Sequence, residues 1–354
     1  MRAPEGQAIS SKSDMRTGAN PAKAGLPAYQ PHRLSIATIV YIPSQEGYFE
    51  HSLEIFTYMI ASLRAATDQP FDLLVFDNGS CAEVVVALRS LCDQKQIDWM
   101  IHSQHNLGKA GAWNWIFAAL PNELICYADS DVLFRPGWLE ASLEVLEAFP
   151  QAGMISAQPN FYDVMKGEGK AHLSLTSDSR YALSDYWPGR EIIDEFCLGI
   201  GATDEIARPF YKSPLPSVKN HGSGVEAVIG ASHMQFLIPR QVARQVVPLP
   251  ASMGLRRAET MSLDYKIDEL GCLHLSTQQP YVFHMGNTLS ERLFAEVEQV
   301  IGSPAASKAR AKQRAARKAT WQRLALRLVQ HPRFNRHFVR LYNFLFQALH
   351  SENG

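Results

Sequence analysis

The C-terminal part of this chain lacks acidic side chains almost completely. No Asp or Glu occurs between residues 299 and 351, whereas eleven Lys and Arg residues lie there. The whole chain has 34 basic and 35 acidic residues, so the remainder carries 23 basic against 35 acidic side chains. A segment of charge +11 therefore follows a body of charge −12, and we expect the two to behave as separate electrostatic units.

Several other features are missing as well. The five cysteines are odd in number and form no CxxC pair, which argues against a disulfide framework and against a cysteine-based zinc site. No apolar run is long enough to span a membrane, and the polar N-terminus lacks the apolar region of a signal peptide. There is no Walker loop. These absences predict a cytoplasmic protein without a P-loop.

With 354 residues, 46% of them hydrophobic, the chain can form one large α/β domain with attachments or two modest domains. Residues 1–33 are rich in Ala, Gly, Pro, Ser and Lys without periodicity, which predicts a disordered leader. Apolar strands and amphipathic helices then alternate, and this order predicts an α/β fold with a single doubly wound, mainly parallel sheet. We expect strands over Leu34–Ile42, Phe71–Phe76, Ile97–Ile101 and Leu124–Ala128, and helices over Glu50–Thr67, Glu83–Leu91, Lys109–Leu120 and Trp138–Phe149.

Regular patterns weaken in the second half of the chain. Met154–Ser156 is a further expected strand, and residues 159–225 show no clear periodicity, which is typical of a functional loop region. Order returns at Val228–Ile238, Leu263–Leu270 and Gln279–His284.

The C-terminal segment 291–354 is expected to form a basic amphipathic helical extension divided by Pro332. Its charge and apolar stripes suit an anionic membrane surface, which residues 306–349 would contact at the inner face of the cell membrane. Packing of the stripes on the rest of the chain or on a second subunit is the alternative. Nucleic acid is not an expected partner, because the aromatic residues lie with the aliphatic ones and not among the basic ones.

The motif that points to chemistry is Asp129-Ser130-Asp131, which follows the apolar run from Leu124 to Tyr127. Two carboxylates at i and i+2 leave a strand on the same face. They repel each other unless a cation lies between them, and hard oxygen ligands suit Mg²⁺ or Mn²⁺. Such an ion keeps open positions that a substrate diphosphate can fill.

Polar residues also follow the other expected strands of the first half. They occur at 41–43, 77–80 and 105–108, in addition to 129–131. Ligands of doubly wound sheets bind at the carboxyl ends of the strands, so these groups are expected to form one site.

The order of these pieces resembles the family 2 glycosyltransferases of the glycosyltransferase-A fold, over residues 34–290. The resemblance depends on the first strand and on four later stretches. They are Val75-Phe76-Asp77-Asn78-Gly79-Ser80, Asn106-Leu107-Gly108-Lys109-Ala110-Gly111-Ala112-Trp113-Asn114, Asp129-Ser130-Asp131 and Gly230-Ala231, followed by a strand that ends in His284.

The resemblance implies a nucleotide-binding half at 34–150 and an acceptor half at 151–290. It implies transfer of a sugar from a nucleotide-diphosphate sugar to an acceptor hydroxyl, with Mg²⁺ or Mn²⁺ and with inversion. The acceptor would be a glycan or a lipid-linked glycan, as in the synthesis of cell-surface polysaccharide or glycolipid.

The resemblance also implies roles for individual residues. Asp77 would accept a hydrogen bond from the base, Lys109 would neutralise phosphate, and Asp129 would face the ribose or a metal-bound water. The implied donor-binding residues are Tyr41, Asp77, Asn106, Gly108, Lys109, Asp129, Gly230 and Ala231, and the implied metal ligands are Asp129, Asp131 and His284.

The catalytic base is the point at which the chain departs from the family. Relatives present an acidic pair about a dozen residues before a glycine, and counting back from Gly271 gives Glu259-Thr260. Glu259 is therefore the first candidate for the base, and Asp264 is the second.

Two other classes of function fit parts of the pattern. A nucleotidyltransferase would need a basic, glycine-rich loop after the first strand, and residues 41–46 have no basic side chain. A non-catalytic nucleotide-sugar-binding module would explain the missing second acid at Thr260.

Overall fold

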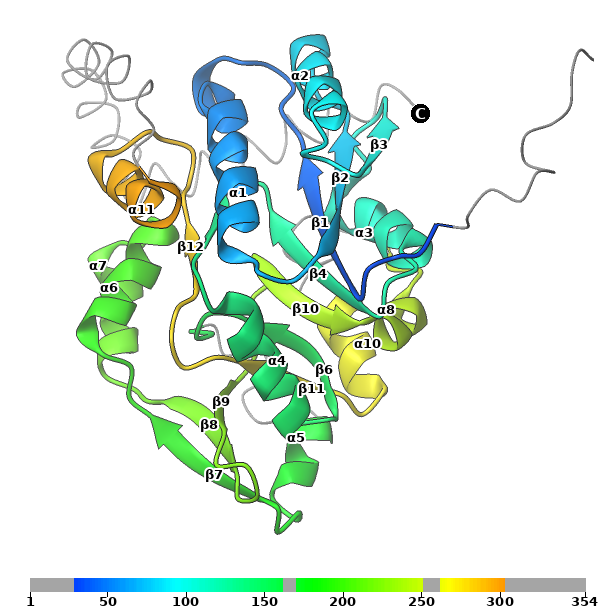
Figure 1. The fold of residues 1–354 in the computed structure, drawn as a ribbon. Coiled ribbons are helices and arrows are strands. Elements are labelled where there is room, and N and C mark those ends of the chain that lie inside the picture. Colours follow the sequence, from blue (N-terminus) through cyan, green and yellow to red (C-terminus); the bar gives the residue numbers. More distant parts are fainter. Residues whose placement is uncertain (1–28, 162–169, 251–261, 303–354) are drawn as a thin grey trace, which may run out of the picture.

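A computed structural model describes residues 29–161, 170–250 and 262–302 (Figure 1). Their strands are β1 Leu34–Val40, β2 Phe71–Asn78, β3 Trp99–Ser103, β4 Leu124–Asp129, β5 Val132–Phe134, β6 Ala152–Ser156, β7 Tyr181–Tyr186, β8 Leu215–Asn220, β9 Glu226–Ile229, β10 Gln235–Pro239, β11 Leu273–Ser276 and β12 Val282–His284. The helices are α1 Ser52–Ala66, α2 Ala82–Asp93, α3 Gly108–Ala119, α4 Trp138–Ala148, α5 Lys170–Leu175, α6 Arg190–Gly199, α7 Asp204–Ala207, α8 Arg240–Val246, α10 Asp264–Glu269 and α11 Glu291–Ile301, with 3₁₀ turns η2 Gly47–Phe49 and η3 Arg208–Tyr211.

One large sheet contains ten strands in the order β3-β2-β1-β4-β10-β6-β11-β9-β8-β7. Strands β3, β2, β1 and β4 are parallel to one another, and β6 and β11 are parallel to each other. Strand β10 enters between β4 and β6 in the antiparallel direction, and β9, β8 and β7 add an antiparallel edge. The predicted α/β class with a single large sheet is confirmed.

Both faces of this sheet are covered by helices, because its strands are apolar on both sides. Along β4, Leu124, Cys126 and Ala128 belong to the core beneath α1, α2 and α4, whereas Ile125 and Tyr127 belong to the core beneath α3, α8 and α10. This alternation is the period of two that a strand imposes. The doubly wound arrangement expected from the sequence is thus present.

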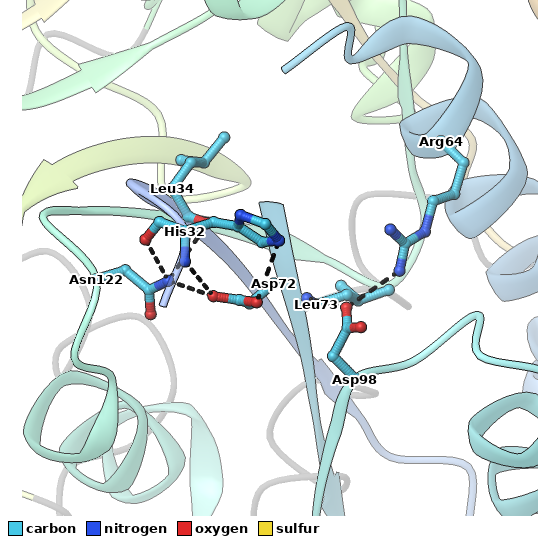
Figure 2. A network of polar contacts seen from close by, with 7 residues as sticks. All are labelled: His32, Leu34, Arg64, Asp72, Leu73, Asp98 and Asn122. Carbon is cyan, nitrogen blue, oxygen red and sulfur yellow. Dashed lines mark hydrogen bonds and ion pairs between the residues drawn. The ribbon is translucent and has the colours of Figure 1, made fainter. Parts of the chain in front are cut away.

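A polar network fixes the amino ends of the parallel strands, opposite the edge that carries the site (Figure 2). The buried Asp72 carboxylate accepts hydrogen bonds from the main-chain N–H of His32 (3.1 Å) and from Asn122 Nδ2 (2.6 Å). The Asp98 carboxylate accepts one from the main-chain N–H of Leu73 (2.7 Å). These bonds join the segments that precede β1, β3 and β4 to the start of β2.

The region 159–225 is more regular than its sequence predicts, and the expectation of a long loop is wrong for the residues described there. It contains α5, β7, α6, α7, η3 and β8. These elements have four to ten residues each, and β7 alternates little because half of its residues are exposed, so periodicity is weak. The aromatic rings of Phe161, Phe196 and Phe210 form a small separate core beneath them.

The expected ordered segment Val228–Ile238 is divided into β9 and β10 at Gly230. This glycine has φ +110°, which residues with a Cβ rarely adopt, and a Cβ there would lie 2.4 Å from Asn160 Nδ2. The chain therefore turns at Gly230 and crosses to the other side of β6 as β10.

Helix α11 follows the expected domain boundary at residue 290. Helix α11 packs on α1, as Figure 1 shows, and Leu293, Phe294 and Val297 are buried in the main core. The folded domain therefore extends at least to Ile301. Residues 303–354, on which the predicted basic extension and membrane contact depend, lie outside the described part, as do residues 1–28 of the predicted leader. Within the described ranges, no helix is long and apolar enough to cross a membrane.

Candidate active site

Three polar side chains meet at the carboxyl end of β4. Lys109 Nζ, from the first turn of α3, lies 2.8 Å from Asp129 Oδ1 and donates to Asp129 Oδ2 at 3.1 Å. The Tyr127 hydroxyl donates to Asp129 Oδ1 (2.6 Å), and Lys109 Nζ also donates to the carbonyl oxygen of His233 (3.2 Å). The Asp129 carboxylate is thus held by a cation and a phenol, which fixes its orientation.

Asp131 faces a different partner. Strand β4 ends at Asp129 and a turn follows, so strand alternation does not extend to Asp131. Strand β5 pairs with β12 in a second, two-stranded sheet with His284 opposite Val132, which brings a residue from far along the chain to the Asp-Ser-Asp turn. His284 Nε2 lies 3.4 Å from Asp131 Oδ2, and both side chains are 30% exposed.

The electrostatics of Asp131 depend on these neighbours. Loss of water around the carboxylate raises the pKa of Asp131 above its ordinary value, and the charge of Asp129 raises this pKa further. His284 and Lys109 act in the opposite direction. A carboxylate of raised pKa beside a second carboxylate is a place where an added cation is stabilising.

Helix α6 closes the site from the side of β12. Its last residue, Gly199, approaches so closely that a Cβ there would lie 3.1 Å from the Cβ of His284. An alanine at position 199 would therefore press on the side chain of His284. Nearby, Arg135 binds both carboxylate oxygens of Glu195 (2.9 Å each) and one of Glu296 (2.8 Å), which ties α6 and α11 to the end of β5.

The ends of β2 and β3 form a hydrogen-bonded turn. Asp77 is fully buried; its Oδ1 accepts from the main-chain N–H of Ser80 (3.0 Å) and its Oδ2 lies 2.6 Å from His102 Nδ1. Asn78 Nδ2 donates to Asn106 Oδ1 (3.0 Å). Asp77 and Asn78 thus stabilise this turn, and the base contact predicted for Asp77 stays a prediction.

A cavity of about 440 Å³ lies beside these groups. This volume is within the range of small-molecule sites. Four of the predicted site residues line it, namely Lys109, Asp129, Ala231 and His284. The opposite wall is apolar and includes the stacked rings of Phe161 and Phe196, whose centroids are 4.4 Å apart.

The other predicted site residues that the structure describes do not line this cavity. Asp131 contacts His284, the lack of a Cβ at Gly230 lets Asn160 approach, and the ring of Tyr41 packs edge-on against Phe49, with ring centroids 6.0 Å apart. Asn106 and Gly108 form the turn before α3, where Gly108 has φ +69° and its N–H donates to Asn106 Oδ1 (2.8 Å).

The two candidates for the base differ in position. Glu259 lies outside the described residues. Asp264, at the start of α10, is buried, and its Oδ1 lies 2.9 Å from His233 Nε2 and 3.6 Å from His274 Nε2. Asp264 does not belong to the cavity lining, whereas His233 does.

Asp131 and His284 fit a divalent ion in part. Adjacent ligands of an octahedral ion that binds at about 2.1 Å are roughly 3 Å apart, close to the 3.4 Å that separates Asp131 Oδ2 from His284 Nε2. Asp129 is bonded to Lys109 and Tyr127 instead. Within the described ranges, no three His, Cys, Asp or Glu side chains are placed to share one ion. Asp131 and His284 are thus two candidate ligands, and an ion held by two ligands would keep open positions.

Sequence reasoning missed His233, Asn78 and Tyr127. His233 has no local signal, because its partner Asp264 is 31 residues away and its approach depends on the turn at Gly230. Asn78 and Tyr127 could have been found from their places, an amide in a turn after a strand and a phenol two residues before an aspartate.

Comparison with known proteins agrees with this geometry. Residues 48–204 match the sequence profile of Glycosyl transferase family 2. This stretch of the chain is similar to that family, and the α/β structure with its large central sheet is consistent with the glycosyltransferase-A fold. The family that the sequence resembles is therefore confirmed over this stretch, and the match supports the predicted class of enzyme, a transferase.

Likeness to solved structures is weaker. S. aureus TarS 1–349 aligns at 12% identity with a TM-score of 0.42 and covers 76% of this chain and 64% of its own, so this chain spans less than two thirds of that protein's length. The mannosyltransferase PcManGT from Pyrobaculum calidifontis, solved with GDP-Man and Mn²⁺, aligns at 15% identity with a TM-score of 0.41 over 91% of this chain and 86% of its own. At these scores nothing about the site follows from either. The comparison with curated proteins found no match.

Proposed function

We propose that this protein transfers a sugar from a nucleoside-diphosphate sugar to an acceptor hydroxyl, with a divalent metal ion and with inversion at the anomeric carbon. The observation that carries the proposal is the convergence of Lys109, Asp129 and His284 at one cavity of about 440 Å³, at the carboxyl end of β4, with Asp131 3.4 Å from His284. Cation and carboxylates at this edge of a doubly wound sheet suit a diphosphate and its metal ion.

The donor would lie across the carboxyl ends of β1, β2, β3 and β4. Lys109 can neutralise phosphate charge while Asp129 holds its ammonium in place. The turns that contain Tyr41, Asp77, Asn106 and Gly108 follow β1, β2 and β3, and we propose these residues as the nucleoside side of the site. Gly230 and Ala231 complete it, the first because it lets Asn160 approach and the second because it lines the cavity.

Asp131 and His284 would hold Mg²⁺ or Mn²⁺. When bound, the ion would stabilise the negative charge that grows on the leaving diphosphate. The two side chains orient one another through their 3.4 Å contact, and the pairing of β5 with β12 fixes their distance. Asp129, held by Lys109, is better placed to face the ribose or a metal-bound water than to bind the ion directly.

The acceptor would enter from the apolar wall of Phe161 and Phe196, because aromatic faces suit the C–H faces of a sugar ring. Glu259 and Asp264 are the residues that the family pattern proposes for deprotonation of its hydroxyl. A glycan or lipid-linked glycan of the cell surface is the acceptor class that the family resemblance supports.

The basic segment supports a further part of the proposal, contact with an anionic membrane through residues 306–349. Its eleven positive charges without an acid would be attracted to anionic lipids. Co-sedimentation of the full chain with anionic and neutral vesicles tests this contact. We expect binding to anionic vesicles that weakens as salt screens the charges, and equal binding to both kinds of vesicle would contradict it.

The central experiment measures thermal stabilisation of the protein by a panel of UDP- and GDP-sugars, with Mn²⁺ and with excess chelator. We expect one donor to raise the melting temperature only with the metal, and the same donor to release nucleoside diphosphate slowly by hydrolysis. Asp131→Ala should remove the metal-dependent stabilisation, because the ion loses its carboxylate ligand.

Asp185→Asn is the matched control, since this exposed carboxylate lies on β7, at the far edge of the sheet. It should behave like the wild type in both measurements. Metal-dependent binding without any release of nucleoside diphosphate would favour the non-catalytic binding module. Full donor binding by Asp131→Ala, or in excess chelator, would refute the metal site.

A further inference from the structure

His233 lies between the proposed donor site and α10. The segment from β9 to β10 passes along the end of β4, where the main-chain N–H of Asp129 donates to the carbonyl oxygen of Met234 (2.8 Å). The carbonyl of His233 accepts from Lys109 Nζ, which also binds Asp129. His233 lines the cavity, and its side chain is 12% exposed.

Its partner Asp264 lies behind it. The Asp264 side chain is 3% exposed, and the distance from its Oδ1 to His233 Nε2 is 2.9 Å. The second oxygen, Oδ2, is buried and has no hydrogen-bond partner among residues 29–161, 170–250 and 262–302. An acceptor in the cavity therefore meets the imidazole and not the carboxylate.

The chemistry of this pair fixes the tautomer. With Asp264 as a carboxylate, which only accepts hydrogen bonds, Nε2 of His233 carries the hydrogen and donates it to Asp264 Oδ1. The other ring nitrogen, Nδ1, then has a free lone pair. Within the described part of the chain, Nδ1 makes no hydrogen bond. A neutral imidazole with its lone pair available and a carboxylate on its far side is the arrangement of a general base.

We propose that His233 is the catalytic base of this protein and that Asp264 is a positioning residue that acts through it. This inference rests on the proposed sugar transfer. Nδ1 takes the proton from the acceptor hydroxyl, whose oxygen forms the new bond to the anomeric carbon. The bond from that carbon to the diphosphate oxygen breaks, and its electron pair leaves with the nucleoside diphosphate. Asp264 stabilises the imidazolium, which later gives its proton to water.

The test uses the full chain and the UDP- or GDP-sugar that stabilises the wild type most, with water as the acceptor. We expect His233→Ala and His233→Gln to lower kcat for nucleoside diphosphate release at least about 100-fold. Donor affinity should stay within about threefold, because the contact of Lys109 is to the main chain of His233. His233→Gln keeps a donor for Asp264, and so it remains folded if the buried carboxylate alone destabilises His233→Ala.

Asp264→Asn separates positioning from mere support of the fold. Its amide donates to Nε2 and leaves the hydrogen on Nδ1, so we expect kcat to fall about 100-fold or more while donor affinity persists. Added imidazole should restore His233→Ala at least about tenfold and should not change Asp264→Asn. His221→Ala, at an exposed histidine between β8 and β9, is the control that should match the wild type with and without imidazole.

Two results would overturn the inference alone. One is a kcat of His233→Ala within threefold of the wild-type value. A large loss of kcat in Glu259→Gln would then identify Glu259 as the base. The other is loss of donor binding in both His233 variants, which would make the residue part of donor recognition. A wild-type protein that neither binds a donor nor releases nucleoside diphosphate would overturn the proposed function, and this inference with it.

Discussion

Acid should destabilise this protein through His172, on α5. The imidazole is buried, and its Nε2 accepts a long hydrogen bond from the main-chain N–H of His274 (3.5 Å). Burial lowers the pKa of His172 to about 4 from the ordinary 6.5, and the neighbouring His274 lowers it further while Asp268 opposes both. Burial also lowers the pKa of His274. The folded protein thus keeps His172 neutral where an unfolded chain would protonate it.

The sign and size of the effect follow from proton linkage. Between pH 6.5 and pH 4 the unfolded state binds a proton that the folded state does not, so the free energy of unfolding falls as pH falls. Each pH unit is worth about 1.4 kcal/mol, and about two and a half units separate the two pKa values. The loss from His172 alone is therefore about 3 kcal/mol, a large part of the total stability of an ordinary domain.

Urea unfolding followed by tryptophan fluorescence, at pH values from 7.5 to 4.5, measures this loss. Other groups titrate in the same range, so the informative quantity is the difference between the wild type and His172→Gln. We expect the free energy of unfolding of the wild type, relative to that of His172→Gln, to fall by about 3 kcal/mol between pH 7.5 and pH 4.5. His221→Gln, at an exposed histidine, should show the same pH dependence of the free energy of unfolding as the wild type. If His172→Gln also shows the pH dependence of the wild type, His172 is not held neutral and the reasoning is refuted.

Two further predictions concern the framework of the site. Gly230→Ala should lower the free energy of unfolding by about 3 kcal/mol, because the residue has a positive φ and its new Cβ would lie 2.4 Å from Asn160 Nδ2. Gly224→Ala, with φ +77° and no atom within 4 Å of the new Cβ, should lose only about 1 kcal/mol. Equal losses of the two variants in urea unfolding would disprove the clash. Asp72→Ala should lower the free energy of unfolding by about 2 kcal/mol, because the main-chain N–H of His32 loses its acceptor and Asn122 Nδ2 loses one of its acceptors, yet donor binding at the other end of the strands should persist. A loss of donor affinity in the folded variant would contradict the separation of the two ends.

The first half of the fold could be predicted because its signals are local. The strands that became β1, β2 and β4 are buried on both faces and read as continuous apolar runs, and the expected bounds differ from the observed ones by only a few residues. The polar residues that follow them could be assigned to one edge for the same reason, since parallel strands bring their carboxyl ends together.

The rest depends on pairings between distant segments. Strands β5 and β12 have three residues each, too few for a periodic signal, yet their pairing places His284 beside Asp131. The small core of Phe161, Phe196 and Phe210 joins residues about fifty positions apart. No local pattern in the sequence records such contacts, so the family resemblance, and not periodicity, identified His284.

The register of β10 shows how a local apolar pattern can determine a contact between distant segments. Phe236 pairs with Tyr127, and both rings lie in the core beneath α3, with centroids 5.4 Å apart. A shift of one residue would move Phe236 to the opposite face, so the apolar pattern of β10 fixes the register. That register places the carbonyl of Met234 on the N–H of Asp129, and therefore His233 beside Lys109. The position of the candidate base is thus set by the packing of aromatic rings in the core.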